Sequence, residues 1–395
     1  MATFIGIGFS QNPNTFLALR EASAQAKRQI NQSSSDLVFV FNTIHYNSSE
    51  ILSSLKEIWE ETPVIGCSTA GIILSESITS RGVAILAIRS EEIKFGVGSV
   101  SDVTAPETRQ AGSLLARSTI ANLGGHPRKA FLFFTDGLLK NSAPIIKGMQ
   151  DVLGTFFPMV GAGSSDDFHF KKTFQYGPTE VMTSGAAGLL IGGQINLSIG
   201  SQHGWKPLGR PRIINQTDGH IIKTIDGKKA SSLYEEYFGK EMEGLRAQQL
   251  GQMAILYPLG IYLPEDNEYL LRNAIDILND GSIVCQGEVP EGSEVHIMLG
   301  NKESCKQAAR KAALEVRKSL KGKNPQLVLI FESLARNKLL GRGAFQEIQL
   351  IKEILGPKTP LLGMYSYGEI APFHSLQHIK KIHLQNASIV ILAIG

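Results

Sequence analysis

The chain has 395 residues, of which 43% are hydrophobic and 19% are charged. This length exceeds one ordinary core, so we expect two globular domains and no extensive disorder. A net charge of +3 is too weak to indicate nucleic acid or an anionic membrane as a partner. The densest basic stretch, residues 302–323, has apolar residues at helical spacing, which is typical of a solvated helix face.

The three cysteines, Cys67, Cys285 and Cys305, are far apart and form no Cys-x-x-Cys pair. This pattern argues against a disulfide framework or zinc ribbon and fits a reducing compartment. The N-terminal segment lacks the basic region and long apolar run of a signal peptide, and no stretch has the ~18 apolar residues of a membrane span. We therefore expect a cytoplasmic protein with neither membrane nor nucleic acid among its partners.

The predicted elements repeat one order of parts three times along the chain. Each segment has an opening apolar strand, a helix, a Pro-x-x-Gly strand and a closing apolar strand. The opening strands are 37–41, 130–134 and 327–331, the helices 49–61, 143–153 and 344–355, the Pro-x-x-Gly strands start at Pro63, Pro158 and Pro360, and the closing strands are 82–88, 188–191 and 387–394. Continuous apolar strands joined by a helix indicate βαβ crossovers in buried sheets. We predict an α/β fold of mixed sheets flanked by helices and built from repeated strand-helix-strand units.

The remaining segments predict helices and a connector. Amphipathic periodicity indicates helices at 15–30, 107–123 and 303–320. Residues 200–227 are rich in Gly, Pro, Asn and Thr and predict an irregular connector with short strands such as 221–225. We place the domain boundary at its end, which gives domains of residues 1–228 and 229–395.

Small and polar residues follow the Pro-x-x-Gly strands, and ligands bind at strand ends in open α/β sheets. These three strand ends are therefore the candidate ligand-facing edges. The predicted ligand-binding residues at or beside them are Cys67, Ser68, Asp136, Gly163, Ser164, Asp166, Asp167, Tyr365, Tyr367 and Glu369.

Several of these residues have two interpretations. On a strand, Asp166 and Asp167 would face opposite ways, so a shared acid–base pair is not expected, whereas loop structure and contact with a ligand ammonium both stay open. Asp136 follows a strand in Thr-Asp-Gly, where turn chemistry competes with a ligand contact. Tyr365, Tyr367 and Glu369 alternate, so one strand would place them on one face, lining a pocket or a domain interface.

A series of short motifs occurs in order over nearly the whole chain. They are residues 63–71, 134–137, 160–168, 203–207, 225–230, 289–293 and 357–372. Each motif alone is a weak signal, but in this order they resemble the FIST family, named for F-box and intracellular signal transduction proteins. The Cys-Ala-Gly-Arg-like turn of the family is replaced here by Glu332-Ser-Leu-Ala-Arg336, so only Arg336 matches as a further ligand-binding residue.

The resemblance implies a ligand-sensing module rather than an enzyme. Because the chain carries no effector domain, it also implies action in trans on a partner, either a sensor histidine kinase or a cyclic-di-GMP enzyme. One standalone branch, the NosP-like proteins, senses nitric oxide through haem, and the chain is similar to it in size and layout. Haem b with nitric oxide as the signal is therefore the leading prediction. A cofactor-free sensor of an amino acid or other metabolite is the first alternative, and an enzyme is the second. A homodimer stays open.

Haem needs an apolar pocket and usually one axial histidine. His203 is the candidate axial ligand, because it lies in one of the family-like motifs. Enzyme motifs are missing. There is no P-loop, Gly161-Ala-Gly163 lacks the third glycine of a dinucleotide site, and the segments 66–71 and 363–366 miss the Gly-x-Ser-x-Gly spacing of serine hydrolases. We therefore predict no catalytic residue.

Overall fold

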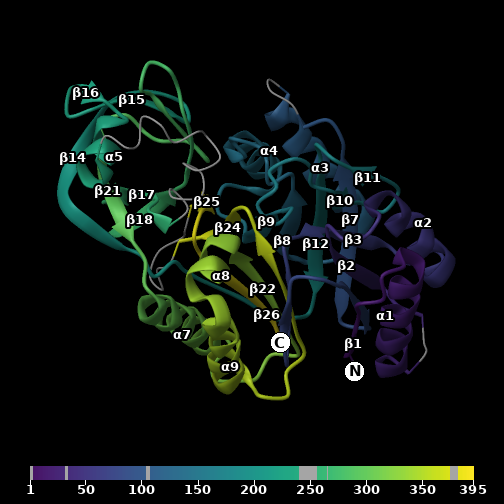
Figure 1. Ribbon diagram of the computed structural model, residues 1–395. Coiled ribbons are helices and arrows are strands. Elements are labelled where there is room, and N and C mark those ends of the chain that lie inside the picture. The colour runs from purple at the N-terminus through teal and green to yellow at the C-terminus, as the bar shows by residue number, and fades with distance from the viewer. Residues whose placement is uncertain (1–2, 32–33, 104–106, 240–255, 265, 374–380) are drawn as a thin grey trace.

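The computed structural model describes residues 3–31, 34–103, 107–239, 256–264, 266–373 and 381–395. Within these residues, three six-stranded sheets share one plan and a fourth sheet is inserted into the third repeat. Helices cover the outer faces of the three similar sheets (Figure 1). The covering helices are α1 (Thr15–Gln29), α2 (Ser48–Trp59), α3 (Thr108–Leu123), α4 (Ala143–Leu153), α7 (Lys302–Ser319) and α9 (Ala344–Leu355). No helix in the described ranges is long and apolar enough to cross a membrane.

The first sheet has the strand order β1-β6-β2-β3-β10-β11. Its strands are β1 (Thr3–Ser10), β6 (Val83–Ser90), β2 (Leu37–Thr43), β3 (Val64–Thr69), β10 (Gln175–Tyr176) and β11 (Val181–Met182). β2 and β3 are parallel and are joined through α2, whereas β6 runs antiparallel to both β1 and β2. The predicted crossover and the mixed sheet are therefore confirmed.

The second and third sheets repeat this plan. The second has the order β25-β24-β9-β8-β12-β7 and the third β13-β26-β22-β23-β4-β5. The strands of the second are β25 (Ile382–Gln385), β24 (Glu369–Pro372), β9 (Met159–Gly163), β8 (Arg128–Thr135), β12 (Ala186–Gly193) and β7 (Ile93–Val100). Those of the third are β13 (Leu197–Gln202), β26 (Ile389–Ile394), β22 (Leu327–Ser333), β23 (Leu361–Ser366), β4 (Ile72–Leu74) and β5 (Ile78–Thr79).

Each sheet is completed by a pair of strands from another repeat. The hairpin β4–β5 of the first repeat joins the third sheet, β10–β11 of the second joins the first sheet, and β24–β25 of the third joins the second sheet. This cyclic exchange ties the three repeats together. Strands from the two sides of the predicted boundary at residue 228 consequently share the second and third sheets.

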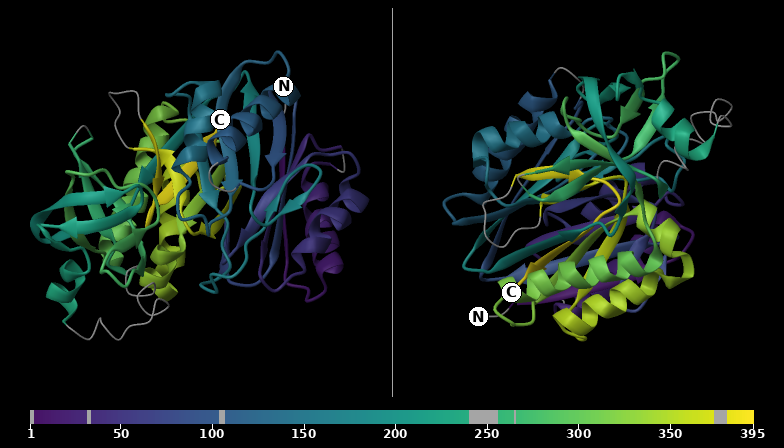
Figure 2. Two further views of the ribbon diagram at one scale, coloured as in Figure 1. Left: turned by 90° about the horizontal axis from the view of Figure 1, so that it is seen from above. Right: turned by 90° about the vertical axis from the view of Figure 1, so that its left-hand side faces the viewer.

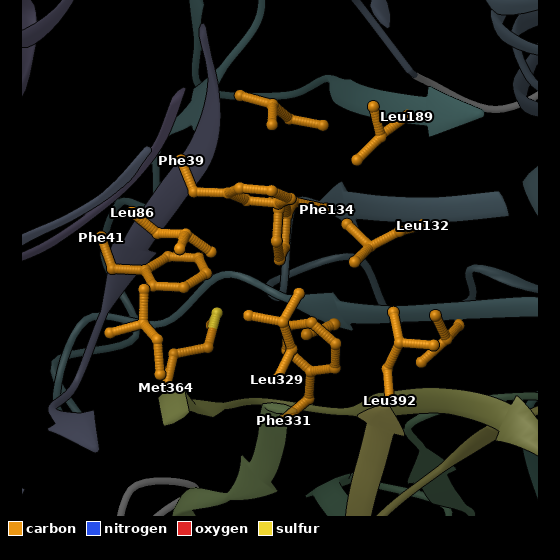
Figure 3. Packing of buried hydrophobic residues seen from close by; sticks show 14 of the residues in the cluster. Phe39, Phe41, Leu86, Leu132, Phe134, Leu189, Leu329, Phe331, Met364 and Leu392 are labelled. Carbon is orange, nitrogen blue, oxygen red and sulfur yellow. The ribbon is translucent and has the colours of Figure 1, made fainter. Parts of the chain in front are cut away.

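A common core lies between the inner faces of the three sheets (Figure 3). The fifth residue of each predicted opening strand is a phenylalanine, and the three rings meet in this core. The Phe134 ring centroid lies 5.5 Å from that of Phe41 and 5.8 Å from that of Phe331. Cys67, Ala162 and Met364, which follow the glycine of each Pro-x-x-Gly strand, are buried in the same cluster. The repeated sequence pattern thus places equivalent side chains around one centre.

The inserted sheet occupies residues between β13 and α7. Its strand order is β18-β17-β21-β14-β15-β20-β19, with β16 paired to β15. Its elements are β14 (Lys206–Asp218), β15 (Ile221–Ile225), β16 (Lys228–Lys229), β17 (Leu259–Leu263), β18 (Glu268–Arg272), β19 (Ala274–Ile277), β20 (Ile283–Cys285) and β21 (Glu294–Leu299), together with helix α5 (Ser232–Phe238). Seen from above, this sheet forms one end of the molecule (Figure 2).

The short strand predicted at 221–225 is confirmed as β15, but the prediction of an irregular connector over residues 200–227 is wrong, because β14 and β15 form central strands of the inserted sheet. Gly and Pro in this segment predict that no strand continues through it, but in β14 these residues lie where the pairing with the neighbouring strand is irregular. Its pairing with β21 shifts register between Leu208 and Arg212, so the intervening Gly209–Pro211 segment needs no regular ladder bonds.

Candidate functional site

The ends of the three Pro-x-x-Gly strands meet in space. Beyond β9, the Ser165 N–H donates to the Ser68 carbonyl at 3.1 Å, and the Ser165 hydroxyl donates to the Tyr365 carbonyl at 2.6 Å. The Thr69 hydroxyl donates to the same carbonyl at 2.8 Å. The three predicted ligand-facing edges therefore form one hydrogen-bonded junction.

The small residues of this junction are fully buried and make internal contacts. Cys67 Sγ lies 3.4 Å from Met364 Sδ, and burial raises the pKa of the Cys67 thiol well above its usual range. The Ser68 hydroxyl accepts the Phe174 N–H, and Ser164 accepts from the Gln175 amide at 2.7 Å. The Gly163 N–H donates to a carbonyl of the third repeat at 2.8 Å. Cys67, Ser68, Gly163 and Ser164 therefore contact the protein's own core.

A cavity of about 360 Å³ opens beside the junction. Its walls come from the chain beyond β8, β9, β22 and β23 and from the inserted sheet. They consist of Gly137, Leu138, Leu139, Lys140, Phe168, His169, Phe170, Asn273, Ala274, Ile275, Gln286, Ser333, Leu334, Ala335, Ser366 and Tyr367. Such a mostly apolar cavity with a few polar groups has the size and character of a small-molecule site.

Three aromatic side chains, here called the aromatic cluster, line this cavity: Phe168, Phe170 and Tyr367. The Phe170 and Tyr367 rings are stacked with centroids 4.9 Å apart, and the Phe168 centroid lies 6.0 Å from that of Phe170. Phe170 is 44% exposed, so part of its ring is accessible to solvent. The cluster thus presents aromatic surface at the edge of the cavity.

Asp166 holds the loop that carries two of these rings. Its carboxylate accepts hydrogen bonds from the Tyr367 hydroxyl at 2.6 Å and from the backbone N–H groups of Phe170, Lys171 and Lys172 at 3.0, 2.7 and 3.0 Å. Both oxygens are therefore engaged, which agrees with the loop interpretation of this residue.

The same loop has strained backbone. Asp167, Phe168 and Phe170 have φ values of 53°, 62° and 50°, in the left-handed region that residues other than glycine seldom adopt. Strain of this kind persists only when surrounding contacts enforce it, and it is common at ligand clamps. Asp167 itself is half-buried and does not line the cavity.

Asp136 lies at the turn that leads into the cavity wall. It accepts the Thr173 hydroxyl at 2.6 Å and the Leu138 N–H at 2.9 Å, and the next residue, Gly137, lines the cavity. Burial raises the pKa of Asp136. These bonds are those of a structural turn, and they place its carboxylate directly behind the cavity lining.

Two amide side chains connect the cavity to the inserted sheet. The Gln286 amide donates to the carbonyls of Tyr367 and Gly137 at 2.5 and 3.3 Å, so its Oε1 is left to accept from Asn386 at 2.9 Å and from Asn273 at 3.5 Å. Oδ1 of the buried Asn273 has no hydrogen-bond partner among the described residues. Sequence reasoning missed Asn273 and Gln286, because neither lies in a repeat or a recognisable motif.

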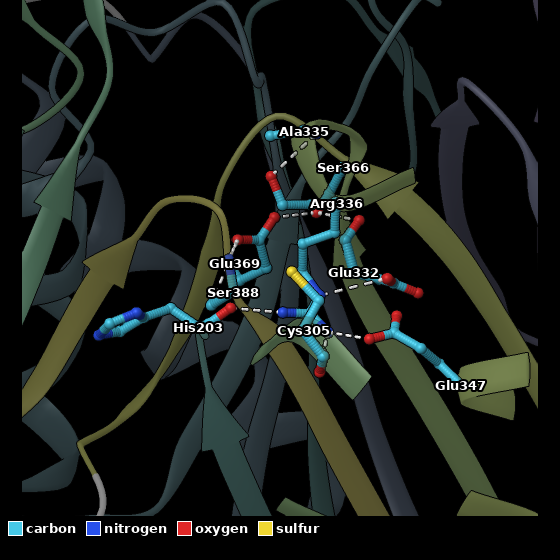
Figure 4. A network of polar contacts seen from close by, with 10 residues as sticks. His203, Cys305, Glu332, Ala335, Arg336, Glu347, Ser366, Glu369 and Ser388 are labelled. Atoms are coloured by element: carbon cyan, nitrogen blue, oxygen red, sulfur yellow. Dashed lines mark hydrogen bonds and ion pairs between the residues drawn. The ribbon is translucent and has the colours of Figure 1, made fainter. Parts of the chain in front are cut away.

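A buried charge cluster joins Glu332 of β22, Arg336 of helix α8 (Leu334–Leu340) and Glu347 of α9 (Figure 4). The Arg336 guanidinium donates to both carboxylates and to the Cys305 carbonyl at 3.0 Å. Burial and the Glu347 charge raise the pKa of Glu332 well above its usual range. Arg336 is fully buried, donates four hydrogen bonds to internal partners and does not line the cavity, so the structure places it in the core.

Tyr365, Tyr367 and Glu369 do not lie on one strand, because β23 ends at Ser366 and β24 begins at Glu369. Of the three, only Tyr367 lines the cavity. Glu369 accepts the hydroxyls of Ser366 and Ser388 at 2.5 and 2.8 Å, and burial raises its pKa to about 8. The expected common face is therefore wrong, since the chain turns between the two tyrosines and Glu369.

His203 does not fit the role of a haem ligand. The Trp205 N–H donates to His203 Nδ1 at 2.9 Å, so the neutral ring carries its proton on Nε2. Burial and the nearby Arg336 lower the pKa of His203 to about 4. A metal-ligating histidine normally has the opposite arrangement, with Nδ1–H donating and Nε2 bare. Its ring also points away from Arg336 and lies outside the cavity lining (Figure 4).

The described residues also contain no group of three or more His, Cys, Asp or Glu side chains that could hold a metal ion.

Comparisons with known proteins place this architecture in a family. The sequence model of the FIST N domain matches residues 36–228, and that of the FIST C domain matches residues 230–372. Uncharacterized protein Rv0628c of Mycobacterium tuberculosis is 23% identical over 374 residues, covering 93% of this chain and 94% of the relative. Uncharacterized protein MJ1623 of Methanocaldococcus jannaschii is also 23% identical, over 88% of this chain and 72% of the relative.

Among solved structures, a chorismatase crystal structure aligns with all of this chain and 99% of its own at 8% identity and a TM-score of 0.37. The two domain models together cover most of the chain. The chain therefore belongs to the FIST family, whose domains are sensor modules of signal transduction that bind small ligands.

Proposed function

We propose that this protein is a small-ligand sensor whose ligand binds in the cavity beside the strand junction. The observation that carries the proposal is the cavity itself, with its apolar lining, its aromatic cluster and its few convergent polar groups. The strained loop of Asp167, Phe168 and Phe170 supports it, because loops of this kind commonly contact ligands.

The position of the cavity provides a route from ligand to signal. Residues of the inserted part of the chain, among them Ala274 and Ile275, line one side of it, and residues of the second and third repeats line the rest. Gln286 and Arg272 already connect the inserted sheet to the third repeat, because Gln286 donates to the Tyr367 carbonyl and Arg272 donates to the Leu384 carbonyl at 2.8 Å. A ligand that contacts both the inserted sheet and the repeats stabilises one arrangement of these two parts and so increases the population of that arrangement.

The partner that reads this shift is part of the proposal. We propose a separate signalling protein, either a sensor histidine kinase or a cyclic-di-GMP enzyme, as the family resemblance implies. The cofactor-free form of the sensor is favoured over the haem form by the hydrogen bonding of His203, which leaves the proton on the nitrogen that iron would need. Nitric oxide sensing through haem is thus not carried into the proposal.

A thermal-shift screen with a metabolite library tests the proposal. A true ligand raises the melting temperature of the wild type in a saturable manner. Leu138→Trp fills the cavity and should abolish this shift, because Leu138 is a half-buried residue of the lining. Leu114→Trp is the matched control, since Leu114 is 52% exposed on α3 and does not line the cavity.

Two results would overturn the proposal. One is the absence of any compound that stabilises the wild type saturably. The other is a set of ligands whose thermal shifts persist in Leu138→Trp, which would place their site elsewhere.

A further inference from the structure

We propose that the ligand is a small, flat aromatic molecule that carries a carboxylate or another anionic group and no ammonium, and that Lys140 selects that charge. The inference rests on the proposed function, because it assigns a ligand class to the same cavity. It is argued from the charges and surfaces of the lining.

The first observation is the absence of negative charge in the lining. None of the described residues that line the cavity is an aspartate or a glutamate. Two carboxylates lie behind the lining: both oxygens of Asp166 accept hydrogen bonds from the protein, four in all, and Oδ1 of Asp136 accepts the Thr173 hydroxyl and the Leu138 N–H. An ammonium group in this cavity would therefore lack an ionic partner, and burying an unpaired charge is strongly unfavourable.

The second observation is the positive charge at the rim. Lys140 lines the cavity with an exposed side chain, and no ion pair of its ammonium occurs within the described ranges. Its backbone is fixed, since the Gly287 N–H donates to the Lys140 carbonyl at 2.8 Å. A ligand anion at the mouth of the cavity therefore finds a cation whose attachment point is held in place.

The third observation concerns the aromatic cluster. Aromatic rings also bind ammonium groups through their faces, which would favour a cationic ligand. Here Lys338 Nζ already lies 5.7 Å from the centroid of the Phe168 ring. A second cation beside it would be repelled, whereas a flat aromatic ring gains edge-to-face or offset contacts with Phe168, Phe170 and Tyr367.

The test uses four probes that share one indole ring and differ in charge: indole-3-acetate, the neutral indole-3-ethanol, the cation tryptamine and the zwitterion tryptophan. Isothermal titration calorimetry gives each dissociation constant. We expect indole-3-acetate to bind at least about tenfold more tightly than tryptamine or tryptophan, with indole-3-ethanol between them.

Charge reversal at Lys140 identifies the selecting residue. In Lys140→Glu the order should invert, so that tryptamine binds more tightly than indole-3-acetate. Lys129→Glu is the matched control, because Lys129 is the second residue of β8, the strand that leads toward Lys140, lies roughly 20 Å from the far end of that strand by strand rise, and does not line the cavity. This control should keep the order of the wild type.

The outcomes separate this inference from the proposed function. Tight binding of tryptamine or tryptophan, an unchanged order in Lys140→Glu, or library ligands that occupy the cavity but are not aromatic anions would overturn the ligand class alone. If no library compound binds in the cavity at all, the sensor proposal falls and the ligand class falls with it.

Discussion

Replacing Asp166 by asparagine should release the loop that carries Phe168 and Phe170. The carboxylate accepts one backbone N–H on Oδ1, from Phe170, and two on Oδ2, from Lys171 and Lys172. Whichever way an asparagine amide turns, its NH₂ group faces at least one of these donors. The loss is one or two hydrogen bonds to a charged acceptor, each worth about 1.5–3 kcal/mol.

Water can reach part of this exposed loop, which reduces the cost, so we expect local opening to become easier by about 2 kcal/mol. That corresponds to a roughly 30-fold loss of protection in native-state hydrogen exchange. The amides of Phe170, Lys171 and Lys172 are the probes. Asp167→Asn is the neighbouring control, because asparagine tolerates its left-handed φ of 53° and the Asp167 side chain bonds to no other residue that the structure describes. Its effect should therefore stay within about 0.5 kcal/mol. Equal protection in both variants would refute the assigned role of Asp166.

Three further predictions concern the core. Arg336→Met leaves two buried carboxylates without their cation and should lower the free energy of unfolding in denaturant by about 3–5 kcal/mol. Adding Glu332→Gln to this variant should restore part of the lost stability. An unchanged free energy of unfolding in Arg336→Met would contradict the assigned role of the charge cluster. The pKa of Glu369 is raised to about 8, so its contribution to the free energy of unfolding is greatest at low pH and is lost as pH rises through that value. Between about pH 5 and 8, the stability of the wild type should therefore fall by at least about 1 kcal/mol relative to that of Glu369→Gln. Parallel stability curves for the two proteins over this range would refute the prediction. Gly66→Ala places a Cβ 1.9 Å from the Val40 carbonyl oxygen and should lower stability by about 1–3 kcal/mol, a prediction that an unchanged denaturation midpoint would contradict.

The repeated fold could be predicted because its signal is local. Each opening strand is a continuous apolar run, and a proline, which has no N–H to donate to a ladder, comes directly before each of the strands β3, β9 and β23. Even the helices at 143–153 and 344–355 have the predicted bounds. The exchange of hairpins between repeats could not be predicted, because two-residue strands such as β10 and β11 carry no periodicity and their partners are remote in sequence.

The site was predictable only in its location. The strand ends identified the junction, and Tyr367 does line the cavity. The roles of the other candidates depend on backbone geometry, since Asp166 binds N–H groups of its own loop and Arg336 is enclosed by two glutamates. Asn273 comes from the inserted sheet, and only the folded chain brings it to the cavity.

The most direct test of the sensor proposal is a crystal structure of the protein with the first compound that passes the thermal-shift screen. The proposal predicts the ligand between the aromatic cluster and the inserted sheet, in contact with Tyr367 and with Ala274 or Ile275. A ligand bound at any other place, with this cavity empty, would contradict it.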